Sequence, residues 1–376
     1  MRRVAVNPRP GWQAKLEEIG FDFHTLDGKL YWTEQAAYVF DAAQIDELEA
    51  ATQELQSLCL KAVEHIVSNR LWKSMHIPEE WGDYIERVWR RQDPSLVGRF
   101  DFVYDGRSPP KLLEYNADTP TSLYEAAVVQ WYWLKDVRPD ADQFNSIHER
   151  LIEGWRGIAA KLPPESTIHF ARFEDHPEDL ATSEYLRDTA IQAGLGTRPM
   201  AVPEVGWNGR RFMDPDDRPI QVMGKLYPWE WMAREEFGRH VLTDTTAFIE
   251  PAWKMILSNK LLLALLWDGF PDHPNLLPAF GEEREALGPA RVKKPVFGRE
   301  GQNVTISGPG LFDTAGGTYS GEGYVWQSYC PLPVFDGNHA LVGSWVIAGE
   351  AAGIGMREDD RRITRNTSRF VPHWFE

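Results

Sequence analysis

Two short segments near residue 100, each carrying one carboxylate, constrain the fold of this chain more than any other feature. Residues 99–102 are Arg-Phe-Asp-Phe, residues 113–116 are Leu-Glu-Tyr-Asn, and the segment between them is rich in Asp, Gly, Ser and Pro. Turn residues between two apolar segments predict a β-hairpin with a longer loop. The register that we expect has three opposing pairs: Arg99 with Asn116, Asp101 with Glu114, and Tyr104 with Lys111.

The opposition of Asp101 and Glu114 predicts a bound cation. Two carboxylates directly across a ladder repel each other. A hard cation such as Mg²⁺ reverses this effect, because it binds one or two carboxylates together with substrate phosphates. A slip of one residue would put the two carboxylates on opposite faces, and an edge strand would leave them in solvent. The apolar residues beside them favour a buried hairpin whose acidic face lines a cleft, which predicts a metal–phosphate site in a phosphate-handling enzyme.

The composition limits the class of protein. The chain has 376 residues, 43% of them hydrophobic, which predicts two or three packed subdomains. Forty basic against 56 acidic residues give a net charge of −16, which disfavours nucleic-acid binding. The two cysteines, Cys59 and Cys330, are too few for a disulfide framework, and we find no signal peptide and no apolar segment long enough to span a membrane. We therefore expect a cytoplasmic protein.

The hydrophobic pattern predicts a mixed fold of α/β and α+β parts. A strand, a helix and a strand at 168–173, 178–193 and 199–205 form a unit typical of a parallel sheet. The other expected elements are a strand at 219–226, a helix over 41–69 capped by Asp41, a helix over 251–268, strands at 291–295, 303–306, 324–329 and 340–347, and glycine-rich loops at 298–302 and 349–355.

The segment directly after the hairpin predicts an anion site. Thr119-Pro120 is typical of a helix N-cap followed by Pro at the first helical position, and the helix would continue to about Leu134. A helix N-terminus attracts anions, so we expect this segment to hold a substrate carboxylate or a transferred phosphate. A plain N-cap without a ligand is the alternative.

Cations and glycines in the last third predict a phosphate clamp. Lys260 lies in the apolar helix expected over 251–268, where a buried ammonium needs an anionic partner unless its head reaches water. Lys294 ends a strand that leads into residues 298–301, Gly-Arg-Glu-Gly, and the backbone amides of such a loop approach phosphates closely. Two weaker candidates are Gln327, on a strand that meets an adenine edge or simply belongs to the core, and Arg357, which braces a phosphate or lies on the surface.

Together these segments resemble the glutathionylspermidine synthase family. The resemblance covers about residues 10–375 and is most specific in residues 99–102 and in Leu-Glu-Tyr-Asn-Ala-Asp-Thr-Pro-Thr at 113–121. It implies an ATP-grasp fold with a preceding parallel-sheet subdomain. It also implies an ATP-dependent carbon–nitrogen ligase, in which ATP phosphorylates a carboxylate and an amine then displaces the phosphate. We divide the chain into a substrate- and metal-binding part, residues 1–245, and an ATP-clamping part, residues 246–376.

The resemblance implies a role for each matching position. ATP and Mg²⁺ are the implied cofactors, and a small-molecule carboxylate and amine are the implied partners. Arg99 would stabilise the transferred phosphoryl group, and Arg357 would complete the catalytic residues. The remaining implied contacts are Asp101, Glu114 and Asn116 with the metal; Lys260, Lys294, Gly298, Arg299, Gly301 and Gln327 with ATP; Thr119 and Thr121 with the carboxylate; and Glu178 or Asp179 with the amine.

The chain also departs from the family pattern. Bifunctional members carry an upstream amidase domain with a nucleophilic cysteine, for which we see no room, so we expect no hydrolysis of the amide product. The acidic positions for a polyamine are not clearly matched, which leaves two alternatives: a ligase for another peptide or amino acid, or a protein that binds a nucleotide without ligation. Because an acyl phosphate hydrolyses in water, we expect residues 298–301 and 313–323 to close as lids.

Overall fold

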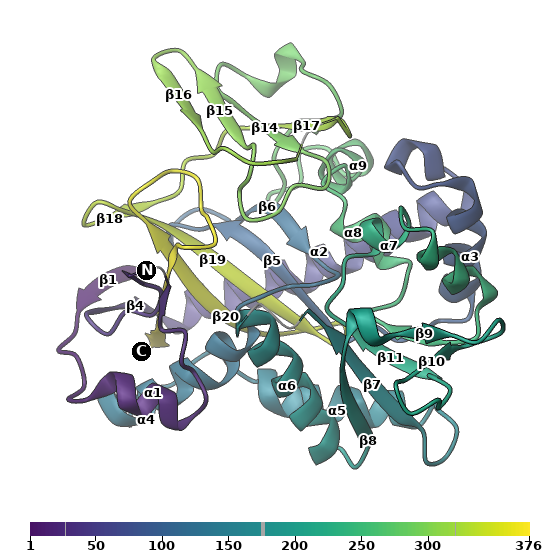
Figure 1. The fold of residues 1–376 in the computed structure, drawn as a ribbon. Coiled ribbons are helices and arrows are strands. Elements are labelled where there is room, and N and C mark those ends of the chain that lie inside the picture. The colour runs from purple at the N-terminus through teal and green to yellow at the C-terminus, as the bar shows by residue number, and fades with distance from the viewer. Residues whose placement is uncertain (27, 174–176, 320) are drawn as a thin grey trace.

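The largest sheet of the computed structural model, which describes residues 1–376 except 27, 174–176 and 320, has six strands (Figure 1). Its order is β21-β20-β19-β5-β6, with β18 beside β19, and all its pairs are antiparallel. The strands are β5 (Val97–Val103), β6 (Lys111–Asn116), β18 (Val334–Phe335), β19 (Asn338–Ile347), β20 (Glu350–Asp359) and β21 (Arg369–Val371). This sheet therefore combines strands from before and after residue 245.

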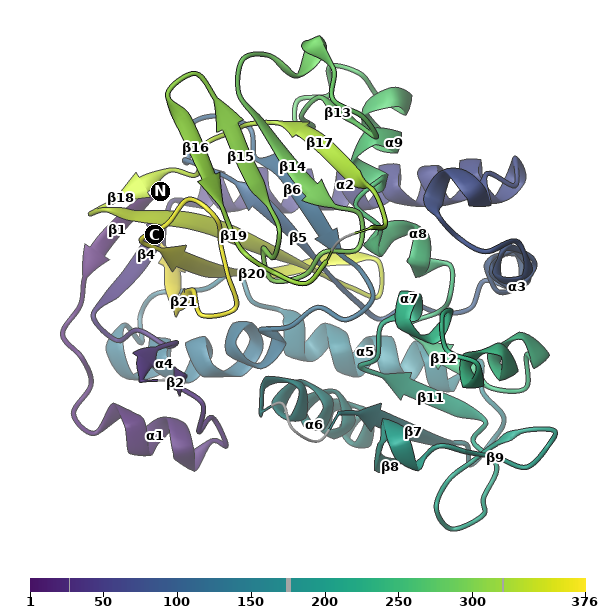
Figure 2. The same cartoon turned by 45° about the horizontal axis from the view of Figure 1, so that its top comes forward.

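Two further sheets lie on either side of the six-stranded sheet in both views (Figures 1 and 2). One is antiparallel, has the order β13-β17-β14-β15-β16 and lies above it. The other is parallel, has the order β12-β11-β7-β8 and lies below it, beside α5 and α6. Their strands are β13 (Ala279–Phe280), β14 (Arg291–Pro295), β15 (Thr305–Gly308), β16 (Leu311–Thr314), β17 (Tyr324–Ser328), β7 (Thr167–Arg172), β8 (Gly196–Ala201), β11 (Val222–Lys225) and β12 (Ala247–Ile249).

The remaining elements complete the layers. The small strands are β1 (Arg2–Ala5), β2 (Thr25–Leu26), β3 (Lys29–Leu30), β4 (Ala36–Phe40), β9 (Gly206–Trp207), β10 (Phe212–Met213) and β22 (His373–Phe375). The α-helices are α1 (Trp12–Glu18), α2 (Ala42–Ser68), α3 (Glu79–Arg90), α4 (Gln130–Val137), α5 (Ile147–Ala159), α6 (Pro177–Gln192), α7 (Trp229–Met232), α8 (Lys254–Ser258) and α9 (Leu262–Gly269). Within the described ranges, no helix combines the length and the apolar character that crossing a membrane requires.

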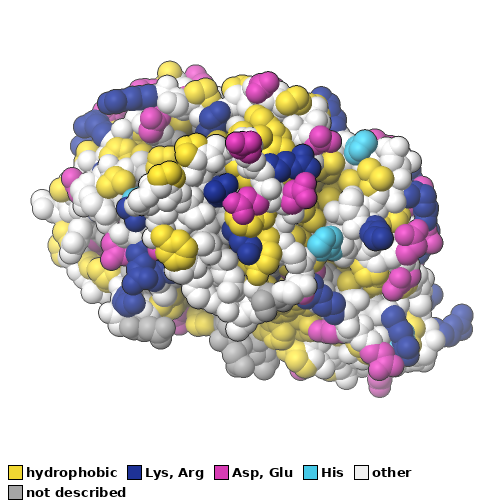
Figure 3. All heavy atoms as spheres, turned by 90° about the horizontal axis from the view of Figure 1, so that it is seen from above, with side chains coloured by type: hydrophobic (Ala, Val, Ile, Leu, Met, Phe, Trp, Pro, Cys, Tyr) yellow, Lys and Arg dark blue, Asp and Glu magenta, His cyan; other side chains and the backbone are white. Residues whose placement is uncertain are grey.

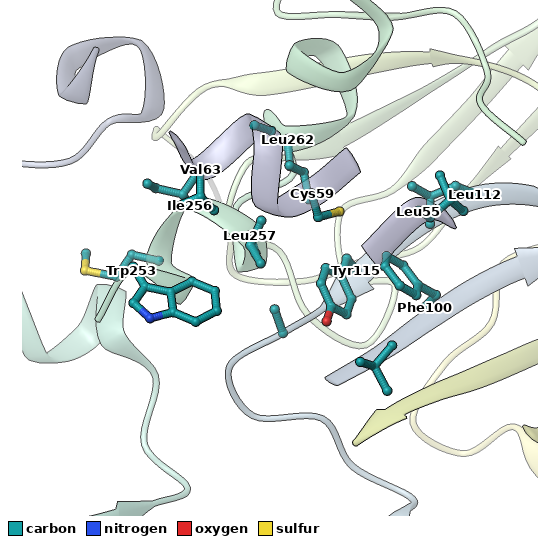
Figure 4. Close-up of a cluster of buried hydrophobic side chains, with 14 of the residues drawn as sticks. Leu55, Cys59, Val63, Phe100, Leu112, Tyr115, Trp253, Ile256, Leu257 and Leu262 are labelled. Carbon is teal, nitrogen blue, oxygen red and sulfur yellow. The ribbon is translucent and has the colours of Figure 1, made fainter. Parts of the chain in front are cut away.

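The apolar face of the hairpin packs against α2 and α8. Phe100 and Phe102 are fully buried, and the ring of Phe100 stacks on Tyr115 at 3.9 Å between centroids. Burial of each such side chain contributes roughly 1.5–3 kcal/mol. Because side chains alternate along a strand, the charged residues of the same two strands face away from this core. Figure 4 shows the packed side chains, which include Leu55, Cys59, Val63, Phe100, Leu112, Tyr115, Ile256 and Leu257.

The predicted register of the hairpin is confirmed where the charges lie and wrong near the turn. Arg99 pairs with Asn116 and Asp101 with Glu114, as expected. Tyr104 does not pair with Lys111, because the register shifts after Asp101 and Val103 takes that place. One extra residue of β6 is accommodated there as a β-bulge, a feature that bends a strand and is common beside functional sites.

The helix predicted over 41–69 is confirmed as α2. Asp41 caps it, since its carboxylate accepts from the backbone N–H of Gln44 while the Gln44 side chain accepts from the Asp41 N–H. The strand–helix–strand unit of the parallel sheet is confirmed as β7, α6 and β8, and the strand at 219–226 as β11.

The single helix predicted over 251–268 is wrong, because the chain forms α8 and α9 with a break at residues 259–261. Lys260 lies in this break. The side chain of Asn259 accepts from the N–H of Leu261 and donates to the carbonyl of Met75, and the N–H of Lys260 bonds to the carbonyl of Val296. These bonds replace the helical ladder, which is the usual competition between asparagine and a helix.

The helix start predicted at Thr119-Pro120 is also wrong. Helical residues begin at Leu123 and form a five-residue π-helical turn, η2 (Glu125–Val129), before α4. Thr119 is not an N-cap, because helical residues begin only four positions later, and its hydroxyl accepts from Arg299. Ser122 has a φ of 67°. A positive φ is uncommon for serine and persists only where surrounding contacts fix the backbone.

The loop predicted at 349–355 is a strand. β19 and β20 form a hairpin whose two turn residues, Ala348 and Gly349, have φ values of 51° and 90°. Positive φ at both positions defines the tight turn that suits the twist of a hairpin. Position 355 in β20 is a glycine because a Cβ atom there would come within 2.8 Å of the ring of Phe370.

Candidate active site

Two cavities meet at the acidic pair of the central hairpin. The lysine cavity, which we name for Lys260 and Lys294 in its wall, has a volume of about 110 Å³. The arginine cavity, which we name for Arg99, Arg299 and Arg357 in its wall, has a volume of about 130 Å³. The residues that line both cavities are Asp101, Glu114, Gly301, Leu341 and Thr364. The two carboxylates thus belong to the wall that the cavities share.

Arg99 and Asp101 form a two-pronged ion pair on β5. Arg99 Nε donates to Asp101 Oδ1 at 2.7 Å, and Nη2 donates to Oδ2 at 3.1 Å. Its Nη1 donates to the carbonyl of Thr121 at 2.6 Å, which ties the segment after β6 to the hairpin. Burial raises the pKa of Asp101 although Arg99 acts against it, and the charge of Glu114 adds to the rise.

Glu114 is paired with a cation from the break between α8 and α9. Its Oε2 lies 3.0 Å from Lys260 Nζ, which also donates to the carbonyl of Gly298 at 2.6 Å. Burial alone would raise the pKa of Glu114, but Lys260 and Lys294 outweigh it and lower the pKa to about 2. Lys260 therefore links the acidic pair to the glycine-rich loop.

Lys294 and Gln327 lie side by side on β14 and β17. Lys294 Nζ donates to Gln327 Oε1 at 2.8 Å and to the carbonyl of Leu113 at 2.7 Å. Burial lowers the pKa of Lys294 to about 8, although Glu114 acts against this shift. The rest of the lysine cavity is largely apolar and includes Val292, Ile306, Leu332 and Leu341. The cavity therefore offers an apolar wall beside two ammonium groups.

Arg299 reaches from the glycine-rich loop into the arginine cavity. Its Nη1 donates to Thr119 Oγ1 at 2.7 Å and its Nη2 to Glu230 Oε1 at 2.8 Å. Thr121 and Gly301 line the same cavity, whereas Gly298 lines the lysine cavity. The guanidinium thus holds the loop against the segment that follows β6.

A buried ion pair anchors that segment to the parallel sheet. Asp118 Oδ1 lies 2.5 Å from Lys225 Nζ, and neither side chain is exposed. The other oxygen, Oδ2, accepts from the backbone N–H of Trp229 at 2.9 Å, and the ring of Trp229 lies under Lys225. Asp118 therefore fixes the position of Thr119 and Thr121 relative to β11.

Arg357 comes from β20 and closes the arginine cavity. Its Nη1 donates to Ser122 Oγ at 3.1 Å, and its other nitrogens donate to the carbonyls of Arg365, Asn366 and Ser368. These bonds hold the guanidinium beside the loop before β21.

The sequence did not predict a group behind Arg357 that includes Tyr31 and Glu125. Glu125 is fully buried, and Tyr31 donates to it at 2.6 Å. Burial and the charge of Glu178 raise the pKa of Glu125 to about 7. Glu178, a predicted amine contact, lies 3.4 Å from Ser122 Oγ but lines neither of the two cavities, and nor does Asp179. The sequence signal that could have identified Glu125 is the presence of a carboxylate inside the apolar segment 123–129.

The acidic pair offers oxygen ligands of the kind that a metal ion needs. Among the described residues no three His, Cys, Asp or Glu side chains are grouped as metal ligands usually are. Asp101 and Glu114 offer two carboxylates, and Asn116 Nδ2 donates to both of them at 3.2 Å. Two carboxylates and an amide oxygen suit Mg²⁺ when substrate phosphates supply the remaining ligands. The residues therefore fit Mg²⁺ once the amide of Asn116 turns its oxygen inward.

Sequence comparison assigns the chain to a family. The family described as "Glutathionylspermidine synthase preATP-grasp" matches residues 3–376. A Haemophilus influenzae protein named "Putative acid--amine ligase" is 43% identical over the full length of both chains. The chain belongs to the glutathionylspermidine synthase family, as its sequence motifs indicated. Because the relatives are named as ligases and synthetases, the predicted enzyme class, a carbon–nitrogen ligase, is confirmed at the level of the family.

Longer relatives match less closely. Trypanothione synthetase of Crithidia fasciculata is 29% identical over 78% of this chain and 49% of its own length. The bifunctional glutathionylspermidine synthetase/amidase of Escherichia coli is 25% identical over 89% of this chain and 58% of its own length. The chain thus spans about half the length of both proteins. A glutathione synthetase-like effector of Globodera pallida shares the mixed α/β fold, with a TM-score of 0.54 at 10% identity over 90% of this chain and 88% of its own.

Proposed function

We propose that this protein is an ATP-grasp ligase that uses Mg·ATP to join a carboxylate to an amine through an acyl phosphate. The observation that carries the proposal is the meeting of two different cavities at Asp101 and Glu114. One cavity has an apolar wall and two lysines, and the other is lined by arginines and hydroxyls. Such a pair of cavities suits a nucleotide on one side and a carboxylate substrate on the other.

In the proposed reaction the protein positions charges and supplies no nucleophile. Lys260 and Lys294 neutralise the phosphates of ATP, and Arg99 stabilises the charge of the transferred phosphoryl group. Gln327, predicted to meet the purine, lines neither cavity and bonds to Lys294 and to the carbonyl of Leu112, so its proposed role is to orient Lys294. Asp101, Glu114 and Asn116 would hold Mg²⁺, which draws negative charge from the phosphates. Phosphoryl transfer depends mainly on such positioning and neutralisation.

The carboxylate substrate lies in the arginine cavity, where Thr119 and Thr121 orient it. Its oxygen attacks the terminal phosphorus of ATP, ADP leaves, and the amine then attacks the acyl carbon and releases phosphate. The glycine-rich loop at 298–301 acts as the lid that keeps water from the acyl phosphate. The segment 313–323 is proposed as a second lid, although its residue 320 lies outside the described residues.

For the substrates we propose a peptide-like acid such as glutathione and a polyamine-like amine. A ligase for another peptide or amino acid is the second candidate. It is favoured because Glu178 and Asp179 lie outside both cavities, and because the relative that matches over its full length has a name that specifies neither acid nor amine. We place the reaction in the cytoplasm, since Cys59 and Cys330 are both free thiols.

The test measures ADP release from Mg·ATP in the presence of a matrix of acids and amines, followed by mass spectrometry of the products. We expect ADP release that depends on both substrates and a product whose mass equals acid plus amine minus water. Nucleotide binding without ADP release from any combination would instead identify a non-catalytic nucleotide-binding protein.

The mixed surface agrees with small-molecule substrates. Figure 3 views the molecule from the side of β15 and β16, and acidic and basic side chains are interspersed on this face. Nucleic-acid binding would require a continuous basic surface.

A further inference from the structure

Glu125 is a fully buried carboxylate behind the arginine cavity, in the π-helical turn η2. Its Oε1 accepts from the hydroxyl of Tyr31 at 2.6 Å. Its Oε2 is buried and has no hydrogen-bond partner within the part of the chain that the structure describes. Burial of a carboxylate with an unsatisfied oxygen is unfavourable, and such groups in native structures often have a chemical role.

A line of hydroxyls connects Glu125 to the cavity. Ser122 lines the cavity, and its Oγ lies 3.2 Å from the hydroxyl of Tyr31. Tyr31 donates its single proton to Glu125, so in its contact with Ser122 the tyrosine oxygen accepts. The single proton of Ser122 has a second, longer contact, 3.4 Å to Glu178 Oε1. Arg357 donates to Ser122 Oγ, and one lone pair of that oxygen remains for a group in the cavity. With the Ser122 proton in the shorter contact, to Tyr31, the hydrogen bonds of this line point from the cavity toward Glu125.

The titratable and charged groups that act on Glu125 come from three different parts of the chain. Tyr31 follows β3, Glu178 lies in α6, and Arg357 lies in β20. Burial raises the pKa of Glu125 to about 7 and Glu178 adds to the rise, whereas the bond from Tyr31 and the charge of Arg357 act against it. A carboxylate that titrates near neutral pH can both take up and release a proton during turnover.

We infer that Glu125 receives the proton of the attacking amine through Ser122 and Tyr31, in the ligase reaction proposed above. An ammonium nitrogen has no lone pair, so it must lose a proton before it attacks. Ser122 takes that proton as it passes its own to Tyr31, and Tyr31 passes its proton to Glu125. The neutral amine then forms the C–N bond, the C–O bond to phosphate breaks, and the bonding pair leaves with the phosphate.

The nitrogen loses its second proton after the bond to carbon has formed, and the departing phosphate takes it. Glu125 returns its own proton along the same hydroxyls to water when the product leaves. Glu125 touches no substrate in this scheme, so it is a positioning and relay residue. A purely structural role, in which Glu125 only anchors Tyr31, predicts a different response to the nucleophile and to pH.

The nucleophile provides the sharpest test. With glutathione as the acid, spermidine is mostly protonated at neutral pH, whereas hydroxylamine is mostly neutral and needs no base. We expect Glu125→Gln to lower kcat with spermidine about 10²- to 10⁴-fold. With hydroxylamine, the kcat of the same variant for hydroxamate formation should stay within about twofold of that of the unmodified protein. Its KM for ATP should be unchanged. Glu125→Asp should restore part of the spermidine reaction, and Glu153→Gln, an exposed carboxylate on α5, should leave both reactions unchanged.

A second measurement needs no turnover. The infrared band of the protonated carboxyl group should disappear as the pH is raised through neutrality, and Glu125→Gln should lack this titrating band. An equal fall of the spermidine and hydroxylamine reactions in Glu125→Gln, or a spectrum without a difference between the two proteins, would overturn the relay alone. Absence of ADP release from the unmodified protein with every acid tested would overturn both the ligase reaction and the relay.

Discussion

The guanidinium of Arg99 holds both carboxylate oxygens of Asp101, at 2.7 and 3.1 Å, from two positions away on the same strand. A two-residue spacing places both side chains on one face of β5, and the flat guanidinium matches the carboxylate with two parallel bonds. The proposed metal ligand and the proposed phosphoryl-stabilising cation are therefore oriented by each other.

Replacement of Arg99 by lysine should separate charge from geometry. Lysine keeps one positive charge beside Asp101 but loses the fork and the bond to the carbonyl of Thr121. We expect the melting temperature to change by only a few degrees while the single-turnover rate falls about 10²-fold or more. A variant with an unchanged rate would contradict the role of Arg99.

Lys294 and its neighbour Lys293 form a matched pair on β14. Lys294 points into the lysine cavity, whereas Lys293 lies over the ring of Tyr324 at 3.8 Å. We expect Lys294→Met to weaken ATP binding about 10- to 100-fold, which corresponds to about 1.4–3 kcal/mol. Lys293→Met should change it by less than twofold. Calorimetric titration with a non-hydrolysable ATP analogue measures the affinity of both variants. Equal losses of affinity would contradict the binding of ATP in the lysine cavity.

Arg299 should control the opening of the glycine-rich loop. Its two bonds, to Thr119 and Glu230, hold residues 298–303 over the site. Charge-assisted hydrogen bonds contribute about 1.5–3 kcal/mol each, so Arg299→Ala should speed hydrogen exchange of this loop by at least tenfold. Glu300→Gln, at an exposed neighbouring position, is the control. Unchanged exchange in Arg299→Ala would mean that other contacts hold the loop.

Removal of one partner of the buried pair Asp118–Lys225 should destabilise the protein far more than replacement of both partners by apolar residues. Removal of one partner leaves an uncompensated charge, so Asp118→Asn should lower the free energy of unfolding by about 3–5 kcal/mol. The double variant Asp118→Leu with Lys225→Met should recover much of this loss. Urea unfolding measures the three proteins, with Glu376→Gln, which breaks an exposed pair with Arg2, as a control expected to change stability by less than about 1 kcal/mol. Additive losses in the double variant would contradict the pairing.

The free energy of unfolding should depend on pH through the titration of Glu125. Because burial raises the pKa of this carboxyl group from 4.5 to about 7, the folded state binds its proton more tightly than the unfolded state does. The free energy of unfolding should therefore fall as the pH rises from about 4.5 to about 7, by at most about 3 kcal/mol. Glu125→Gln should lack this component and be the more stable protein at pH 8. Urea unfolding at pH 5 and pH 8 compares the two, and parallel pH dependence would contradict the shift.

The sequence predicts those parts of the structure that local chemistry determines. The turn residues and alternating strands predict the pairing of Asp101 with Glu114, and the capping box predicts the start of α2. The β-bulge near Leu113 carries no comparable local signal, since it depends on how β6 meets its neighbours. The same holds for the break at Lys260, where apolar periodicity continues through residues that bond to Met75 and Val296 instead.

The candidate site follows the same division. Residues that lie close together in the sequence, such as Glu114 and Asn116, were predicted to lie close together in space, and the structure brings them within 3.2 Å. Glu125 could not be assigned, because its partner Tyr31 lies 94 residues earlier in the chain. Its burial in turn depends on the packing of β20 against η2, which no local pattern reports.

The pairing of β5 with β19 determines when during synthesis the protein can become complete. Phe102 lies opposite Val342, 240 residues later, so the inner edge of β5 has no strand to pair with until almost the whole chain has left the ribosome. Unpaired strand edges of this kind bind other chains, and pairings between distant residues form slowly. A nascent or shortened chain that ends before β19 should therefore aggregate, and a chaperone that shields this edge during translation should raise the yield of active protein.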